Sequence, residues 1–102
     1  MYVSVVSAIR FEWDPSKAAS NLRKHGIGFA EACTVFEDDE ALLMPDPDHS
    51  DTEDRWVLLG MSAAARVLVV IHCERADGET IRLISARKAD RDERQAYADR
   101  SS

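Results

Sequence analysis

The chain has 102 residues, 45% hydrophobic and 31% charged, which is the composition of one ordinary soluble globular domain. No apolar run approaches the roughly 20 residues that a membrane-spanning helix needs, so a membrane protein is not expected. The net charge of −6 argues against a nucleic-acid binder. However, nine acidic residues and no basic residue fall in residues 37–54. The remainder of the chain carries 13 Lys/Arg against 10 Asp/Glu. That remainder is compatible with an RNA contact on one side.

The N-terminal residues 2–6 are apolar but short, with no basic region before them, so they do not make a convincing signal peptide. We therefore expect a cytoplasmic protein. One domain is predicted over residues 1–102, with 1–8 as a possible extra segment and 90–102 as a C-terminal helix and tail. Cys33 and Cys73 form no CxxC motif and are expected to be free, buried thiols.

The first part of the chain predicts one strand followed by two helices. Alternating apolar and charged residues predict a strand over 9–13. Asp14 as N-cap and Pro15 at the first helical position then predict a helix, which Gly26 ends. Apolar residues at i, i+3, i+4 and i+7 predict a second helix over 29–36.

The second part predicts strands over 55–61, 66–74 and 79–88, preceded by a short strand candidate at 41–44, and then a last helix over about 90–99. The main elements follow the order β-α-α-β-β-β-α. This order predicts an α+β fold, with an antiparallel sheet packed by helices on one face.

The last two strands are predicted to form a hairpin around a three-residue loop, 76–78, with glycine last. In that register Arg75 pairs with Glu79, and the odd-numbered residues 67–73 face the core. A two-residue loop would slip the register and regroup the side chains. With the three-residue loop, one open face collects five polar residues, namely His72, Glu74, Arg66, Arg82 and Lys88.

A histidine, a carboxylate and several cations on an open sheet face are the groups needed to cleave RNA without a metal ion. A base takes the proton of a 2′-hydroxyl, cations stabilise the transition state, and an acid protonates the leaving oxygen. The residues alone favour a simpler interpretation, in which Arg82 and Glu74 form a cross-strand ion pair and His72 fills surface space.

Other kinds of site find less support. The three histidines, His25, His49 and His72, have no metal-ligand spacing to each other or to the cysteines. An apparent calcium-loop start at 46–50 has Asp51 where glycine is required. No metal and no cofactor are therefore expected.

The chain resembles the BrnT toxins of bacterial type II toxin–antitoxin systems over about residues 9–98. The residues that carry the resemblance are Phe11-Glu12-Trp13-Asp14, Asn21-Leu22-Arg23-Lys24-His25-Gly26, Phe29-Ala30-Glu31-Ala32, Asp48-His49-Ser50, Glu53-Asp54-Arg55, Gly60, Glu74-Arg75, Ile81-Arg82-Leu83-Ile84-Ser85-Ala86-Arg87-Lys88-Ala89, Arg94 and Tyr97.

This resemblance implies a RelE-like fold and a metal-independent RNA endonuclease that cleaves mRNA, inhibits translation and arrests growth. It also implies neutralisation by a cognate BrnA-like antitoxin in a hetero-oligomer. Such an antitoxin would carry a ribbon-helix-helix DNA-binding segment, so promoter DNA would be reached only through it. The alternative from another class is a non-catalytic protein-binding or regulatory module with a RelE-like fold.

We expect cations of the 79–88 strand to take part in catalysis. Glu74 or His72 is expected to act as the base or acid. The cations that bind and stabilise the scissile phosphate are Arg82, Arg87 and Lys88. The predicted register places Arg87 on the side opposite Arg82, so its role depends more on the resemblance. The supporting RNA-binding residues are Arg55, Arg66, Arg75, Lys24 and His25.

Overall fold

The computed structural model describes residues 2–6, 9–47 and 54–100. The Asp48-His49-Ser50 and Glu53 parts of the resemblance lie outside this range. No helix in the described part of the chain is long and apolar enough to cross a membrane. The elements, in chain order, are β1 (Tyr2–Val6), β2 (Ile9–Trp13), α1 (Pro15–His25), α2 (Phe29–Thr34), the 3-10 helix η1 (Val35–Glu37), β3 (Leu42–Pro45), β4 (Arg55–Met61), β5 (Val67–Glu74), β6 (Thr80–Lys88) and α3 (Arg91–Asp99).

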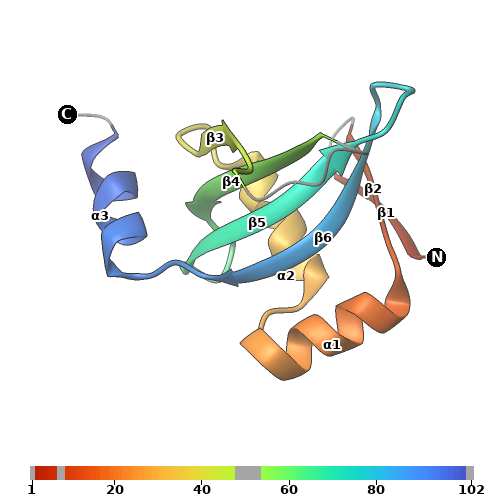
Figure 1. Ribbon diagram of the computed structural model, residues 1–102, viewed down its shortest axis with the longest axis horizontal. Helices are drawn as coiled ribbons and strands as arrows, with labels where there is room; N and C mark the ends of the chain where they lie inside the picture. The colour runs from red at the N-terminus through yellow and green to blue at the C-terminus, as the bar shows by residue number, and fades with distance from the viewer. Residues whose placement is uncertain (1, 7–8, 48–53, 101–102) are drawn as a thin grey trace.

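These elements confirm the predicted α+β class, and the strands form one sheet in the order β1-β2-β6-β5-β4-β3 (Figure 1). The prediction of an antiparallel sheet is wrong for one pair, because β2 runs parallel to β6. The chain passes through both first helices and three strands before β6 forms, and it returns beside β2 in the same direction. β1 was not predicted, and it extends the sheet by pairing antiparallel with β2.

Helix α1 lies along the edge of β6 beyond the point where β2 ends (Figure 1). Asp14 caps its first turn by accepting a hydrogen bond from the Ser16 amide at 2.9 Å. The buried Asn21 side chain binds both backbone groups of Ala86, accepting from its amide at 3.0 Å and donating to its carbonyl at 2.8 Å. Asn21 therefore satisfies backbone groups that the edge of β6 would otherwise leave without a strand partner.

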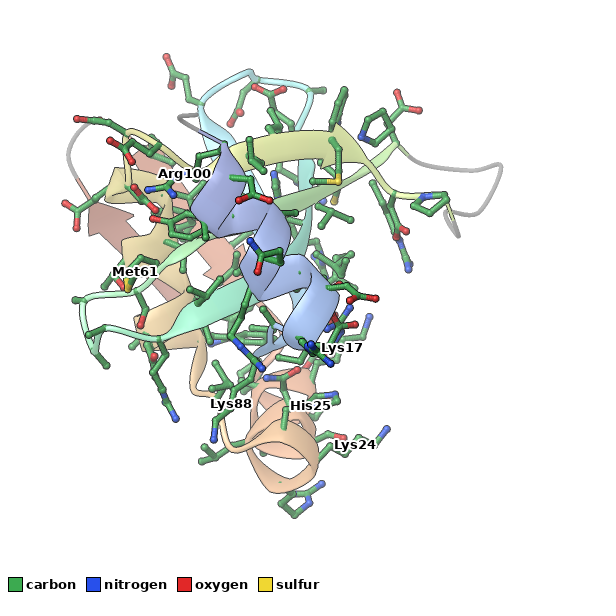
Figure 2. All side chains as sticks on the ribbon, turned by 90° about the vertical axis from the view of Figure 1, so that its left-hand side faces the viewer. Lys17, Lys24, His25, Met61, Lys88 and Arg100 are labelled. Carbon is green, nitrogen blue, oxygen red and sulfur yellow. The ribbon has the colours of Figure 1, made fainter. Side chains whose placement is uncertain are left out.

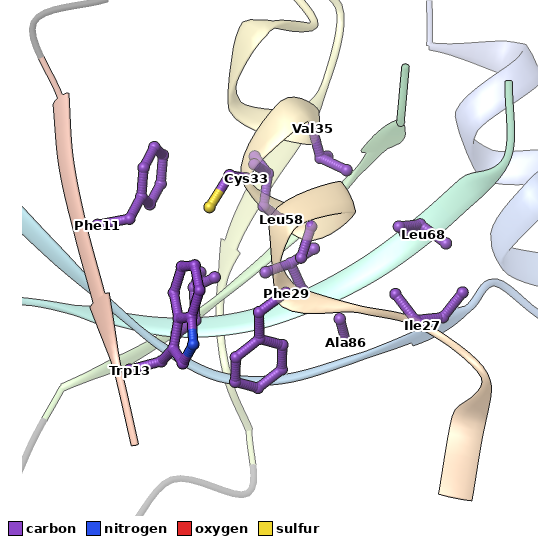
Figure 3. Close-up of a cluster of buried hydrophobic side chains, with 12 residues drawn as sticks. Phe11, Trp13, Ile27, Phe29, Cys33, Val35, Leu58, Leu68 and Ala86 are labelled. Atoms are coloured by element: carbon purple, nitrogen blue, oxygen red, sulfur yellow. The ribbon is translucent and has the colours of Figure 1, made fainter. Parts of the chain in front are cut away.

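Helix α2 packs on one face of the sheet and encloses the main core (Figure 3). Phe29, Cys33 and Val35 contribute from the helical side, and Leu68 and Val70 from β5. Both cysteines are free and buried, as predicted, and burial raises the pKa of Cys33 to about 12.

Gly60 on β4 marks the closest approach between the sheet and the segment after α2. A Cβ at this position would lie 2.8 Å from Ala41 Cβ and 2.9 Å from Val35 Cγ1. Such distances are too short for a side chain, so glycine is the residue that permits this close packing.

The prediction that the helices pack on one face is wrong for α3. Asp90 and Glu93 form the predicted capping box, and Tyr97 then packs with Leu59 and Val69 on the face opposite α2. The Tyr97 hydroxyl donates to Asp38 Oδ2 at 2.5 Å. A helix with few apolar residues is thus held by one buried aromatic anchor and covers only one end of that face.

The predicted hairpin register is wrong for two reasons. The β5–β6 loop is one residue longer than predicted, because Arg75 bonds to Thr80 rather than Glu79 and Glu74 pairs with Ile81. A β-bulge at Ile84 then adds a further residue to β6, so Leu68 pairs with Lys88. Each one-residue slip moves side chains to the other face of the sheet.

Candidate functional site

The sheet face opposite α2, which we call the open face, carries a row of three charged residues and one buried cysteine across four strands. Glu12 on β2 pairs with Arg82 on β6, which pairs with Cys73 on β5, which pairs with Arg55 on β4. Paired residues share a face, and neighbouring strands lie about 4.8 Å apart. The backbone positions of Arg82 and Arg55 are therefore separated by about 10 Å.

Glu12 lies between two arginines at one end of this row. Its Oε1 atom is 3.0 Å from Arg75 Nε and 3.8 Å from Arg82 Nη1, and the Glu12 side chain is only 14% exposed. Oε1 is buried and takes part in no hydrogen bond, so these contacts are charge pairs without hydrogen-bond geometry. This largely buried carboxylate is balanced by two cations, and its Oε1 atom can still accept a hydrogen bond.

The bulge at Ile84 brings Arg87 to the open face, where the predicted register did not place it. Arg87 pairs with Val69, and Arg82 pairs with Cys73, two positions that lie on the same side of β5. Arg87 donates to both oxygens of Glu93, at 2.7 and 2.8 Å, and this pairing raises the pKa of Arg87 and lowers the pKa of Glu93. Helix α3 thus holds the second cation of the face.

His72 and Glu74 do not share the open face with Arg82, which contradicts the predicted grouping. His72 pairs with Trp56 and Leu83 on the α2 side. His72 is 5% exposed, and its ring packs edge-on against Phe36 at 4.9 Å between centroids. Burial lowers the pKa of His72, so the ring is neutral near pH 7.

Arg66 and Lys88 also lie away from the Arg82 row. Arg66 donates to Glu31 from Nε at 3.0 Å and from Nη2, and Glu31 also accepts from Ser62 at 2.7 Å. Lys88 pairs with Leu68, which belongs to the core under α2, and the Lys88 charge contributes to lowering the pKa of Glu31. These two cations form part of a structural cluster around Glu31.

The last turn of α1 adds cations at the margin of the open face. Lys24 and His25 are exposed there and line a shallow hollow of about 190 Å³ with Ser85 of β6. Ser85 pairs with Ile71 between the Arg82 and Arg87 positions. Figure 2 shows Lys24, His25 and Lys88 toward the end of the molecule that α1 occupies.

The open face thus brings together Arg55, Arg82 and Arg87, with Arg75 and the α1 cations at its margins. Glu12 was not among the predicted site residues, although strand alternation places it on the side opposite the buried Phe11 and Trp13. Within residues 2–6, 9–47 and 54–100, no group of three His, Cys, Asp or Glu side chains is placed to hold a metal ion. The fold and this face define an α+β protein suited to binding an anionic polymer on an open sheet.

Comparison with known families identifies the class. The family model that describes the ribonuclease toxin BrnT of type II toxin–antitoxin systems matches residues 13–93. The chain therefore belongs to the BrnT family of ribonuclease toxins. The chain is also similar to the crystal structure of the Brucella abortus ribonuclease toxin BrnT, with a TM-score of 0.61 and 26% identity. That match covers 78% of this chain and 94% of the other. No curated protein sequence matched.

Proposed function

We propose that this chain is an RNA endonuclease that cleaves mRNA in the cytoplasm without a metal ion, and thereby inhibits translation and arrests growth. The observation that carries the proposal is the row Glu12–Arg82–Cys73–Arg55, because it combines a desolvated carboxylate with cations on an accessible face. The family membership supports the choice of RNA as the substrate. The RelE-like topology stays a prediction.

In the proposed reaction Glu12 acts as the general base. Its carboxylate removes the proton of a 2′-hydroxyl, and the resulting oxygen attacks the adjacent phosphorus. Arg82 and Arg55 stabilise the extra negative charge of the five-coordinate transition state. The bond to the 5′ oxygen breaks, solvent supplies the proton to that oxygen, and the products are a 2′,3′-cyclic phosphate and a 5′-hydroxyl.

Arg82 is the principal phosphate ligand in this proposal. Its side chain is 22% exposed and lies beside Glu12, so a phosphate bound to Arg82 brings the adjacent 2′-hydroxyl to the Glu12 carboxylate. Arg87 lies about 13 Å from Arg82 along β6, because their partners on β5, Val69 and Cys73, are four residues apart. Arg87 therefore binds a neighbouring phosphate rather than the scissile one, and Lys24 and His25 extend the same path.

Cleavage of a defined RNA with and without EDTA tests the chemistry directly. We expect the same cut positions and rates in both samples, with 2′,3′-cyclic phosphate ends read at nucleotide resolution. An RNA with a single 2′-O-methyl group at the cut position is the matched control and should resist cleavage there. Loss of cleavage in EDTA would contradict the metal-free mechanism.

The partner is proposed to be a BrnA-like antitoxin with a ribbon-helix-helix segment, through which promoter DNA is bound. A type II system requires a protein antitoxin, and the family membership supports this. Co-expression of a small ribbon-helix-helix protein from the neighbouring reading frame should restore growth and co-purify with the chain. Growth arrest that persists despite a stable complex would contradict neutralisation by this partner.

A further inference from the structure

A small cavity of about 250 Å³ opens on the α2 side of the sheet, at the end where the β5–β6 loop lies. It is walled by Phe36, Leu58, Ile81 and Trp56, with His72 and Glu74 as its polar groups. The volume lies below the roughly 300–1,000 Å³ of pockets for drug-sized ligands, and suits one flat ring system. Because Trp56 is only half-buried, its ring is available to a ligand.

The two polar groups of this cavity are both hydrogen-bond acceptors at neutral pH. His72 Nδ1 lies 3.4 Å from the Val70 carbonyl, an oxygen that can only accept, so the tautomer with its proton on Nδ1 fits this contact and has Nε2 as an acceptor. His72 is 5% exposed and lines the cavity. Glu74 is exposed and provides a carboxylate. Two acceptors within aromatic walls suit a flat ligand with a donor edge.

The cavity continues into the cationic part of the molecule. Trp56 follows Arg55 on β4 and Glu74 precedes Arg75, so consecutive residues face the cavity and the open face in turn. A wider hollow of about 720 Å³ is lined by Trp56, Glu74 and Arg75 together with Asp54. An RNA strand with a phosphate bound to Arg55 or Arg75 therefore passes the mouth of the cavity at the end of the sheet.

We propose that this cavity receives one unstacked base of the RNA substrate, which stacks on Trp56 and presents its donors to Glu74 and His72. The inference rests on the proposed function and adds a base-reading subsite to it. Sequence-specific RNA recognition uses splayed bases that stack on aromatic side chains and are read along their hydrogen-bonding edges. Guanine presents two adjacent donors, N1–H and the N2 amine, and is the favoured base.

The two acceptors of the cavity, with Arg75 at its mouth, favour RNA over an apolar protein segment as the occupant. An apolar side chain of a protein partner would fill the walls but leave the Glu74 and His72 acceptors without a donor, and unpaired polar groups weaken binding. A nucleobase satisfies both acceptors, and its phosphate reaches Arg55 or Arg75. Occupation by the antitoxin is the alternative that the experiment separates.

Fluorescence titration with non-cleavable RNA tests the subsite. The probes are four fully 2′-O-methylated heptamers that differ only in their central base within a uridine background. Trp56 is half-buried whereas Trp13 is buried in the core, so stacking should quench the Trp56 part of the emission. We expect quenching to be strongest with the guanine heptamer, and equal affinity for all four would overturn the acceptor assignment.

Two variants separate stacking from folding. Trp56→Phe keeps an aromatic surface, so it should bind close to parent affinity by fluorescence anisotropy while losing the quench. Trp56→Leu keeps apolar volume without an aromatic face, so its affinity should fall about 10-fold. Its circular dichroism and melting temperature should match those of Trp56→Phe, which serves as the folding control. Parent affinity and cut-site preference in Trp56→Leu would overturn the proposal.

The same variants distinguish this inference from the proposed function. If the parent protein cleaves RNA and Trp56→Leu cleaves the same positions at the same rate, the base subsite is wrong and the nuclease stands. If the parent neither binds nor cleaves any RNA, the proposed function itself fails. If Trp56→Leu keeps RNA binding but is no longer neutralised by the antitoxin, the cavity belongs to the protein partner, and the RNA proposal is overturned.

Discussion

Two arginine–carboxylate clusters lie on opposite faces of the sheet and use the same residue types differently. On the α2 side, Glu31 accepts hydrogen bonds from Arg66 and Ser62, and its pKa is lowered mainly by the Arg66 contact. On the open face, Glu12 approaches Arg75 and Arg82 without a hydrogen bond to its buried Oε1. The oxygens of Glu31 are satisfied by its own partners, whereas Oε1 of Glu12 can accept a further hydrogen bond.

The two clusters indicate how a carboxylate with a structural role differs from one that is proposed to act in catalysis. A carboxylate whose oxygens already accept hydrogen bonds is stabilised as it stands and gains little from a ligand. A buried oxygen that lacks such bonds is costly to fold, and this is the reason for proposing a catalytic role for Glu12. We therefore expect substitutions in the Glu31 cluster to change stability, and substitutions in the Glu12 cluster to change cleavage.

The largest expected effect is that of Glu12→Gln. Removing the general base while keeping the size of the side chain should slow single-turnover cleavage at least about 100-fold. Binding of 2′-O-methylated RNA should not weaken, because the substitution removes a negative charge that repels phosphate. The matched control is Glu31→Gln, which should lower the melting temperature and leave cleavage by the folded protein at the parent rate. Equal losses of cleavage in both variants would remove the distinction.

Asn21→Ala is expected to have the next largest effect, and it acts on stability. The Asn21 side chain makes three hydrogen bonds, to the Ile27 carbonyl at 2.9 Å and to both backbone groups of Ala86. Leaving these buried groups without partners should lower the free energy of unfolding by about 3 kcal/mol. Urea denaturation checks this, and Ser20→Ala on the same helix is the control. A change below about 1 kcal/mol would contradict the edge-sealing role.

A smaller effect is expected for Arg87→Gln, because Arg87 binds a flanking phosphate in this account. RNA cleavage should fall about 10-fold, through weaker binding rather than slower chemistry. Because Arg87 holds Glu93 of α3, the melting temperature is measured in parallel and Glu93→Gln serves as the control for α3 docking. A loss of the maximal rate at saturating RNA would instead place Arg87 at the scissile phosphate.

The smallest predicted effect is a pH dependence of stability that His72 confers. Burial lowers its pKa below 6.5, so the unfolded chain binds more protons than the folded one below that pH. Stability should therefore decrease as pH falls from about 6.5 toward 5, above the range where the carboxylates titrate. His72→Phe keeps an aromatic ring against Phe36 and should flatten this slope. An unchanged slope would assign the dependence to other groups.

The element bounds could be predicted well from the sequence, because each depends on local signals. The alternation around Phe11 and Trp13 defines β2, and Asp14 and Gly26 bound α1 to within a residue of the observed ends. The parallel pairing of β2 with β6 has no local signal, since it depends on how the chain returns to the sheet. β1 was also missed, although residues 2–6 are rich in β-branched valine.

The candidate site was harder to predict, because it depends on register. One additional loop residue moved His72 and Glu74 to the face opposite Arg82, and the bulge at Ile84 brought Arg87 onto the same face as Arg82. Neither change has a strong sequence signature, and each one-residue slip reverses which face a side chain occupies. The cationic strand itself was visible from the sequence, but its carboxylate partner Glu12 lies on a distant strand.

The comparison between the two faces is tested most directly by measuring single-turnover RNA cleavage for Arg82→Gln and Arg66→Gln under identical conditions. Both changes remove one arginine charge beside a carboxylate, and circular dichroism establishes the folded fraction of each. We predict at least about a 100-fold loss of rate for Arg82→Gln and a near-parent rate for folded Arg66→Gln. Parent-like cleavage by Arg82→Gln, or an equal loss in both variants, would contradict it.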